Sequence, residues 1–411
     1  GIEHNLATDQ ALQKLLQGTG LTFKYSSNNT IVLERVPHSE ASTLPAVKVT
    51  AKSEEAHDAL PYQVKTSTAG SKVPVEITKV PQGIQVITET AIEDQGALSV
   101  SNILKQVPSA TIIGSRFSRF PRASIRGFRA DQTRNGMRQI FGGDVDYSAL
   151  SNIQSMEVLK GPGSTVFGQT TNEGGGIINV ITKRPFDKFA SELSFTRGGY
   201  DEFDGDITSG QWDVNSPLTP DGALKARFTG EIEGTESFIK NVGLDRENFG
   251  LALSWDNGGP VRAFINAEYQ HRLSGSSMGL PTLGTVVNSG IGQLSRDTFL
   301  GEPGFYNKAD AETPLLQAWL DIDIAKNWTI SPRFQYNEFN VNQDQIFMGT
   351  SSLDAVNNRI NVTRSGRTGF TEQDRAFIGQ IDINGKVETG PLTHQIYLGG
   401  DYTKEHFGTA W

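Results

Sequence analysis

Residues 189–411 carry a strict two-residue alternation of apolar and polar side chains, and this pattern limits the fold more than any other feature of the sequence. Along residues 328–337, one face carries Trp328, Ile330, Pro332, Phe334 and Tyr336. The other face carries Thr329, Ser331, Arg333, Gln335 and Asn337. Because successive side chains of a strand point to opposite faces, such segments predict β-strands with one apolar and one polar face.

The chemistry of the two faces favours a membrane barrel over a water-soluble sandwich, which would also alternate. The polar face carries Arg, Glu and Asp, which suit a water-filled lumen, and the apolar face carries almost no charge. The chain has no apolar run of about 18 residues, so it predicts no transmembrane helix. A barrel escapes that test because only every second residue of a strand meets lipid. The predicted fold class is mainly β, with a transmembrane antiparallel β-barrel.

The lengths of the joints between strands support the same conclusion. Short joints at residues 257–261, 326–327 and 388–392 alternate with long joints at roughly 272–314 and 340–373. Barrels of the outer membrane have short periplasmic turns and long external loops. We count about nine strands of roughly ten residues each. Since bacterial barrels close with an even number of strands, we expect further strands beyond this chain.

Residues 1–36 predict a small α/β unit at the start of the chain. Helical spacing of apolar residues in 11–16 predicts a short helix, and Leu21–Tyr25 and Thr30–Val36 predict two strands. A unit of this size cannot bury an adequate core alone. We therefore expect it to be part of a larger domain.

Residues 37–73 combine prolines, Ser, Thr and mixed charge, and predict a linker. Within it, residues 44–50 (Leu-Pro-Ala-Val-Lys-Val-Thr) form an extended, β-branched segment. A tethered segment of this kind is suited to adding itself to the edge of another protein's sheet. A strand formed by chance is the alternative.

Residues 74–185 predict a compact mixed α/β domain. Strands are expected at Val80–Ile87, Ile125–Phe128, Met156–Leu159 and Ile177–Thr182, and a short helix at Ser99–Gln106. The Lys-Arg-Pro sequence at 183–185 closes the domain, and residues 186–411 form the barrel part.

Three motifs in this domain resemble the plug of TonB-dependent receptors, in wording, order and spacing. They are Ile-Arg-Gly-Phe at 125–128, Met-Glu-Val-Leu-Lys-Gly-Pro at 156–162, and Gly-Gly-Gly-Ile-Ile-Asn-Val-Ile-Thr-Lys-Arg-Pro at 174–185. The Lys-Arg-Pro ending is similar to the ferric-siderophore branch, including ferrichrome and pyoverdine receptors. Residues 1–36 resemble the C-terminal half of the periplasmic signalling domain shared by secretins and TonB-dependent receptors (STN-like). Members of the family have about 22 barrel strands, so this chain would hold the first nine or so.

The resemblance implies active import of a ferric siderophore across the bacterial outer membrane. The implied partners are the ferric siderophore, TonB of the TonB–ExbB–ExbD complex, outer-membrane lipid and an inner-membrane anti-sigma regulator that reports ligand occupancy. The N-terminal domain would lie in the periplasm and the receptor would be a monomer. The TonB-binding segment, or Ton box, would be Leu44, Pro45, Ala46, Val47, Lys48, Val49 and Thr50. The ligand class favoured by family likeness is a hydroxamate.

Arginines and aromatics cluster between residues 116 and 138, a pattern that suits an anionic, oxygen-rich ligand. Solvated loop arginines are an equally weighted alternative for any one residue. In the family, loops on either side of this region face the external cavity. The candidate siderophore-binding residues are Arg116, Phe117, Arg119, Phe120, Gln132, Ile140, Phe141, Tyr147, Met278, Leu280 and Phe347.

Other function classes find little support in the sequence. The chain has no Cys, and its six His show no zinc-ligand spacing, so we expect no catalytic residues, no metal site and no cofactor, with iron carried only inside the siderophore. Residues 163–170 nearly spell a phosphate-binding loop, but Gln169 stands where Lys is required. A net charge of -9 argues against a nucleic-acid partner. A passive porin-like channel, a secretin-type assembly protein and a receptor for a non-siderophore ligand are the alternatives.

One position departs from the family pattern. Lys160 stands before Gly-Pro where plugs usually have Arg, and plug arginines typically pair with barrel glutamates. Lys cannot form the two-pronged contact that Arg makes with a carboxylate. We therefore do not expect that pair at this position.

Overall fold

The chain divides into two compact units, Gly1–Pro45 and Ala46–Trp411, in this computed structural model. In the first unit, β1 (Leu21–Tyr25) pairs antiparallel with β2 (Ile31–Arg35), in agreement with the two predicted strands. The structure describes residues 16, 21–25, 31–35, 61–113, 122–139, 150–163, 174–199, 205–275, 277–302 and 308–410.

A five-stranded sheet forms the centre of the domain that precedes the barrel strands. Its order is β10-β9-β12-β11-β5. The strands are β5 (Gly83–Thr88), β9 (Asp131–Arg134), β10 (Met137–Arg138), β11 (Ile153–Lys160) and β12 (Gly176–Thr182). Both central strands, β11 and β12, are buried along almost their whole length, which requires cover on both faces. The predicted strands at 156–159 and 177–182 are confirmed, and the strand predicted from Val80 begins only at Gly83.

Two short helices cover the sheet, and their start points follow from capping side chains. The hydroxyl oxygen of Thr88 accepts from the backbone N–H of Ala91 at the start of α2 (Glu89–Asp94). The hydroxyl oxygen of Ser99 accepts from the N–H of Asn102 at the start of α3 (Val100–Leu104). Such caps satisfy N–H groups that have no partner inside the helix. The core beneath them contains Val100, Ile103, Leu104, Ile125, Met156, Val158, Ile178 and Val180.

The remaining small elements correct one prediction. A three-stranded sheet contains β6 (Ala110–Ile113), β7 (Arg122–Ile125) and β8 (Phe128–Arg129). Residues 125–128 were predicted as one strand, but β7 and β8 form a hairpin whose turn is Arg126 and Gly127, both with positive φ. The Arg-Gly pair supplies the left-handed turn residues, so the motif specifies a chain reversal.

The predicted linker is partly structured at its end. The two-residue strand β3 (Thr66–Ser67) pairs with β4 (Val75–Glu76), which leads into the short 3-10 helix η1 (Ile77–Lys79). A second such helix, η3, spans Leu150–Asn152. We call residues 65–73 the tether segment, because they connect the N-terminal part of the chain to the central sheet.

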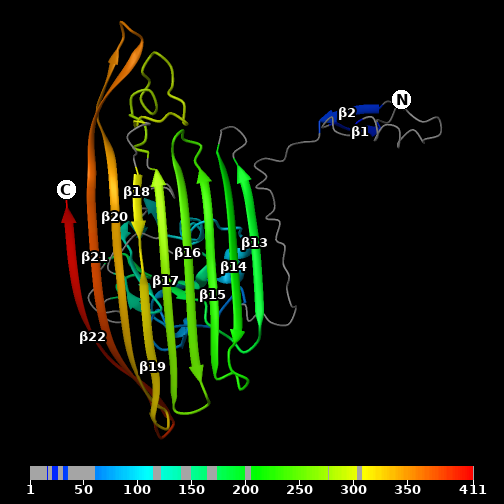
Figure 1. The fold of residues 1–411 in the computed structure, drawn as a ribbon, viewed down its shortest axis with the longest axis vertical. Coiled ribbons are helices and arrows are strands. Elements are labelled where there is room, and N and C mark those ends of the chain that lie inside the picture. The colour runs from blue at the N-terminus through cyan, green and yellow to red at the C-terminus, as the bar shows by residue number, and fades with distance from the viewer. Residues whose placement is uncertain are drawn as a thin grey trace, which may run out of the picture. The chain divides into compact units, whose positions relative to one another are not determined.

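A ten-stranded antiparallel sheet accounts for the alternating region, and its neighbouring strands lie side by side in Figure 1. Strands β18 and β19 both pair with β17 and β20, so the ten strands fill nine positions, as the sequence predicts. The strands are β13 (Ala190–Gly199), β14 (Asp206–Pro217), β15 (Leu224–Glu236), β16 (Gly243–Asp256), β17 (Val261–Gly275), β18 (Lys308–Glu312), β19 (Leu315–Ala325), β20 (Trp328–Asp354), β21 (Arg359–Thr389) and β22 (Leu392–Ala410).

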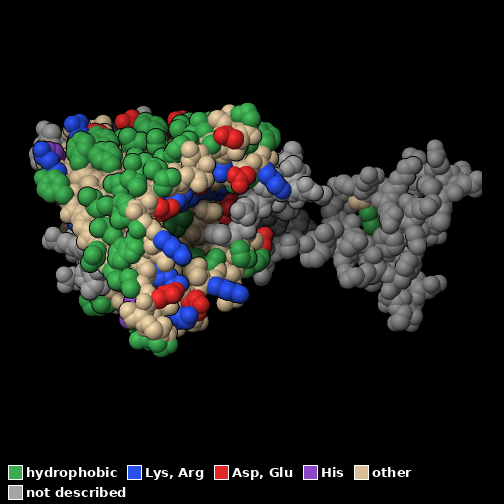
Figure 2. Space-filling view, turned by 90° about the horizontal axis from the view of Figure 1, so that it is seen from below, with side chains coloured by type: hydrophobic (Ala, Val, Ile, Leu, Met, Phe, Trp, Pro, Cys, Tyr) green, Lys and Arg blue, Asp and Glu red, His purple; other side chains and the backbone are tan. Residues whose placement is uncertain are grey.

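Side-chain exposure confirms that apolar residues face outward and polar residues inward. On β15, Phe228 is 42% exposed and Ile232 is 50% exposed, whereas Thr229 and Glu231 are each 1% exposed. Figure 2 looks at the sheet from one end and shows hydrophobic side chains on the outer surface, with charged side chains around a hollow. An apolar outside and a polar inside are the arrangement of a membrane barrel. None of the described helices has the length and apolar character to cross a bilayer.

The joints follow the predicted alternation, with one correction. The short turns at 257–260, 326–327 and 390–391 all lie at the lower end of the sheet in Figure 1. The long joint after β17 is present, although strands β17 and β18 occupy its two ends. The joint predicted at 340–373 is wrong as a loop: β20 and β21 continue as paired strands to Asp354 and Arg359. Continuous backbone pairing therefore makes a long hairpin, and only residues 355–358 turn.

Candidate functional site

The predicted ligand-binding residues fall in separate parts of the structure. Gln132 lies on β9 and is 9% exposed. Phe347 lies on β20 and is 41% exposed, and Met278 and Leu280 lie in the loop that follows β17, half-buried. The structure thus places the four described candidates on the central sheet, on a barrel strand and in one loop. The other candidates (Arg116, Phe117, Arg119, Phe120, Ile140, Phe141, Tyr147) and the TonB-binding segment 44–50 lie outside the described residues.

A tight turn of the central domain docks against the inner face of the barrel sheet. Asn135 and Gly136 connect β9 to β10, both with positive φ, as an Asn-Gly turn allows. The Asn135 amide donates to Gln317 Oε1 on β19 at 2.8 Å, and Gln317 donates to the Arg134 carbonyl at 2.9 Å. Gln335 on β20 donates to the Arg138 carbonyl at 2.8 Å. Barrel side chains therefore satisfy backbone groups that the turn leaves open.

Beside this turn, Arg134 forms a two-pronged pair with Glu268 of β17. Arg134 Nε donates to Glu268 Oε1 at 2.8 Å, and Arg134 Nη2 contacts Glu268 Oε2. The two side chains are 6% and 2% exposed. A fork-to-fork contact of this kind fixes orientation as well as distance. At Lys160, where the family usually has Arg, the ammonium donates to Gln85 Oε1 within the sheet at 3.3 Å.

A second charged contact joins the central domain to the start of the barrel. Lys183 Nζ lies 2.6 Å from Glu89 Oε1 of α2 and 2.9 Å from Asp213 Oδ2 of β14. Arg227 of β15 holds the same Asp213 through two hydrogen bonds of 2.8 and 2.6 Å. Burial by itself would lower the pKa of Lys183, but the carboxylates of Glu89 and Asp213 outweigh burial and raise that pKa above its ordinary value. The Lys183 ammonium therefore stays charged at neutral pH.

The tether segment is held to the central sheet by one buried carboxylate. Glu157 of β11 is 5% exposed. Its Oε1 accepts from Ser67 Oγ at 2.8 Å and from the Thr68 N–H at 3.2 Å. Its Oε2 accepts from Thr68 Oγ1 at 3.2 Å and from the Asn179 amide at 2.8 Å. This carboxylate therefore links the tether segment to the neighbouring strand β12.

From Asn179, the polar contacts continue toward the barrel. Asn179 Oδ1 accepts from Thr133 Oγ1 at 2.9 Å and from the Gly136 N–H at 3.0 Å. Gly136 belongs to the turn that docks on Gln317. A continuous set of hydrogen bonds thus connects the tether segment, the sheet and the barrel wall.

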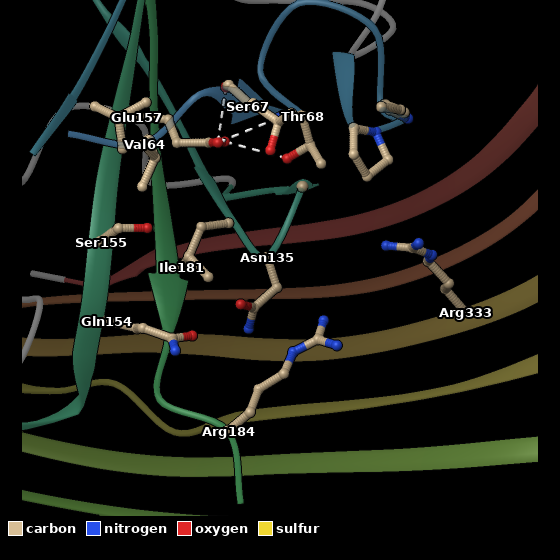
Figure 3. Close-up of a pocket in the computed structure, with 15 residues that line it drawn as sticks. Val64, Ser67, Thr68, Asn135, Gln154, Ser155, Glu157, Ile181, Arg184 and Arg333 are labelled. Atoms are coloured by element: carbon tan, nitrogen blue, oxygen red, sulfur yellow. Dashed lines mark hydrogen bonds between the residues drawn. The ribbon is translucent and has the colours of Figure 1, made fainter. Parts of the chain in front are cut away.

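A cavity of about 340 Å³ lies between the tether segment, the central sheet and the barrel wall. Figure 3 shows Ser67, Thr68 and Glu157 on one side of it, Asn135 in the middle, and Arg184 and Arg333 opposite. Among the described residues, no group of three or more His, Asp or Glu side chains gathers to hold a metal ion. The cavity lining instead carries three cationic side chains, Lys72, Arg184 and Arg333.

Most of these contacts were not identified from the sequence. The Asn-Gly pair at 135–136 is a strong hairpin signal and could have located the docking turn. Glu268 and Gln317 alternate with apolar neighbours on their strands, which places them in the lumen. Their partners on the central domain lie more than a hundred residues away in sequence, so no local pattern pairs them.

Comparison with known protein families identifies two parts of the chain. Residues 76–176 match the family described as TonB-dependent Receptor Plug Domain. Residues 1–36 match the family described as Secretin and TonB N terminus short domain.

Curated relatives are similar over the middle of the chain. The metal-pseudopaline receptor CntO of Pseudomonas aeruginosa is 26% identical over 257 residues, which cover 62% of this chain and 34% of the relative. The ferrioxamine B receptor of Salmonella typhimurium is 25% identical over 252 residues, which cover 61% of this chain and 34% of the relative. The matched part spans about a third of the length of these relatives.

Solved structures share the fold. FpvA of P. aeruginosa, solved bound to heterologous pyoverdines, superposes with a TM-score of 0.72 at 20% identity, covering 99% of this chain and 51% of that one. The ferric-catecholate import receptor Fiu of Escherichia coli K12 superposes with a TM-score of 0.71 at 20% identity, covering 84% of this chain and 53% of that one. The chain thus spans about half of each of these structures.

Proposed function

Since the chain belongs to the TonB-dependent receptors of the bacterial outer membrane, we propose that it serves the TonB-driven import of a ferric siderophore. The observation that carries the proposal is the seating of the plug (residues 74–185) against the polar inner face of a lipid-facing barrel sheet. Arg134, Asn135 and Lys183 make these contacts. A barrel whose lumen holds a docked domain needs that domain to move before a solute as large as a siderophore can pass.

The siderophore would bind on the external side of the plug. The proposed contacts remain the same eleven residues. Those of the plug are Arg116, Phe117, Arg119, Phe120, Gln132, Ile140, Phe141 and Tyr147, and those of the barrel are Met278, Leu280 and Phe347. Arg donors and aromatic walls suit an oxygen-rich, iron-chelating ligand. Two curated relatives support this ligand class, because their names describe them as receptors for metal-pseudopaline and for ferrioxamine B.

The energy for import would reach the plug through residues 44–50. We propose that these residues pair with the edge of a TonB sheet, so that pulling on them acts on the tether segment next. The tether segment is bonded to Glu157, which gives the pull a defined point of attachment.

The test is a single substitution in the full-length receptor. Val47→Pro should abolish iron uptake and leave siderophore binding unchanged, because Pro removes a backbone donor and disrupts strand pairing. Thr43→Pro, just outside the proposed segment, is the matched control and should keep uptake. Normal uptake by Val47→Pro would exclude residues 44–50 as the TonB-binding segment.

We further propose that residues 1–36 contribute to signalling through an anti-sigma regulator. Deletion of this region should spare uptake and abolish ligand-induced transcription of the receptor's operon. The match to the short N-terminal domain of secretins and TonB-dependent receptors supports this second output. Unchanged induction after the deletion would exclude it.

A further inference from the structure

The cavity beside the tether segment lies at the end of the barrel that carries the short turns. Arg333 is near the start of β20, which follows the short turn at 326–327. Arg184 follows β12 and precedes the first barrel strand. Figure 2 views this end and shows charged side chains around a hollow. Short turns mark the periplasmic side of a barrel, so the cavity lies on the periplasmic side of the plug.

Two aromatic side chains hold the cavity's guanidinium groups in place. The Arg184 guanidinium lies 4.9 Å from the ring centre of Phe264 and 5.2 Å from that of Trp319. The Arg333 guanidinium lies 5.8 Å from the same Trp319 ring. Phe264 and Trp319 are each 5% exposed and point into an otherwise polar lumen. A guanidinium stacked on a ring keeps its N–H edges free for an acceptor.

The two arginines differ in their protein partners. Arg333 Nε lies 3.1 Å from Asp382 Oδ2, so part of its charge is compensated. Within the described residues, no carboxylate or carbonyl accepts a hydrogen bond from Arg184. Burial lowers the pKa of Arg184, the neighbouring Arg333 lowers it further, and Asp321 opposes them. A negative group between the two guanidiniums would relieve their repulsion.

The other charged groups at the cavity do not remove its preference for a negatively charged ligand. Lys72 of the tether segment adds a third cation to the lining, with Asp382 and Asp401 as the acidic groups near it. Glu157 is the acidic side chain of the lining, and Ser67, Thr68 and Asn179 already occupy its oxygens. The charged side chains of the lining are therefore three cations and one carboxylate whose oxygens already accept hydrogen bonds.

We propose that this cavity is a binding site for an oxygen-rich anionic group, held between Arg184 and Arg333 on the periplasmic side of the plug. The identity of the biological ligand rests on the proposed function. The ligand is the chelating or carboxylate end of the imported complex, as that complex leaves the barrel for the periplasm. A volume of about 340 Å³ accommodates one such end, since ligand pockets begin at about 300 Å³. Carboxylate and hydroxamate oxygens are the acceptors that fit a guanidinium fork.

The site is tested first without any import assay. Citrate serves as the probe, titrated by calorimetry into the purified full-length receptor. The variant Arg184→Gln removes the guanidinium that has no acceptor in the part of the chain that the structure describes, so it strands no described carboxylate. The matched control is Arg262→Gln, which removes an arginine paired with Asp323 outside the cavity, at the same end of the barrel. Heat-modified mobility in gels verifies that each barrel is folded.

The expected result is citrate binding that Arg184→Gln weakens about ten- to a hundredfold, the loss typical of one charge-assisted contact. Arg262→Gln should bind like the wild type. Arg333→Lys, which keeps a charge beside Asp382 but loses the planar fork, should show an intermediate loss. Absence of citrate binding, or equal binding by wild type and Arg184→Gln, overturns the site.

An uptake assay in cells then tests whether the site takes part in transport. Arg184→Gln should slow uptake of the ferric siderophore several-fold, while binding of the siderophore at the cell surface stays unchanged. If the wild type does not import siderophores but its citrate binding depends on Arg184, the proposed function fails and the anion site stands. If import is normal in Arg184→Gln and citrate binding is unaffected, the site fails and the proposed function stands.

Discussion

Replacing Glu157 with Gln tests whether one carboxylate fastens the tether segment to the plug. The carboxylate accepts three hydrogen bonds from Ser67 and Thr68 and one from Asn179. Gln has nearly the same shape but one of its two acceptor oxygens becomes an NH₂ donor. The Asn179 amide would then face a donor, whereas the Thr68 hydroxyl can rotate and accept from the new NH₂ group. The three contacts to Ser67 and Thr68 would all lose the charge that strengthens them.

The magnitude follows from these contacts. Hydrogen bonds to charged groups contribute about 1.5–3 kcal/mol each, and neutral ones about 0.5–1.5 kcal/mol. Changing three charge-assisted tether contacts into neutral ones should lower the free energy of tether docking by about 2–4 kcal/mol. A free-energy change of about 1.4 kcal/mol changes an equilibrium constant tenfold, so the population with an undocked tether segment should rise about 30- to 700-fold.

Hydrogen exchange measures this population directly, because the Thr68 N–H is itself donated to Glu157. The peptide that covers residues 61–76 should exchange faster by that factor in Glu157→Gln, and peptides from the barrel strands should not change. Glu236→Gln, an exposed position at the end of β15, is the matched control. Exchange at Thr68 within about twofold of the wild type would refute the reasoning, since the fastening would then lie elsewhere.

The two charged contacts between plug and barrel give further predictions. Lys183→Met should weaken plug docking by about 3–5 kcal/mol, the cost of stranding a buried carboxylate, measured as the urea concentration at which protease digests the plug. Because Arg227 still pairs with Asp213, the stranded group is Glu89, and the double variant with Glu89→Gln should recover most of the loss. The raised pKa of Lys183 means that its contribution is fully present at neutral pH and is lost as the pH rises through that pKa, so the same assay should show no change between mildly acidic and neutral pH. Arg134→Lys should cost about 1–3 kcal/mol because one prong of the fork is lost, and an unaltered digestion profile would contradict that role.

Sequence patterns predicted the elements whose structure depends only on residues that are adjacent in the sequence. Two-residue alternation located the barrel strands. The buried runs at β11 and β12 were also predicted as strands, although the prediction at 156–159 begins three residues after β11 does. The nine strand positions also agree with the count from the sequence. These predictions succeeded because the period of side chains along a strand is set by the backbone itself.

Predictions of turns and loops were less accurate. Residues 125–128 contain apolar ends and were predicted as a strand, yet positive φ at Arg126 and Gly127 makes them a hairpin turn. Residues 340–373 carry many polar side chains and were predicted as a loop, yet they pair as β20 and β21. Where a hairpin meets water on both faces, alternation is lost although the backbone pairing continues.

By itself, the sequence determined a barrel with outward apolar faces, a mixed α/β domain before it and the plug motifs. These features depend on the two-residue alternation of side chains and on short contiguous sequence motifs. The tertiary structure alone decided how the domain is seated. Only the structure brings Arg134 to Glu268, Asn135 to Gln317 and Arg184 to Trp319, from positions more than a hundred residues apart. Such pairs depend on the register of strands across the barrel and on the depth of the plug, and no local pattern records either quantity.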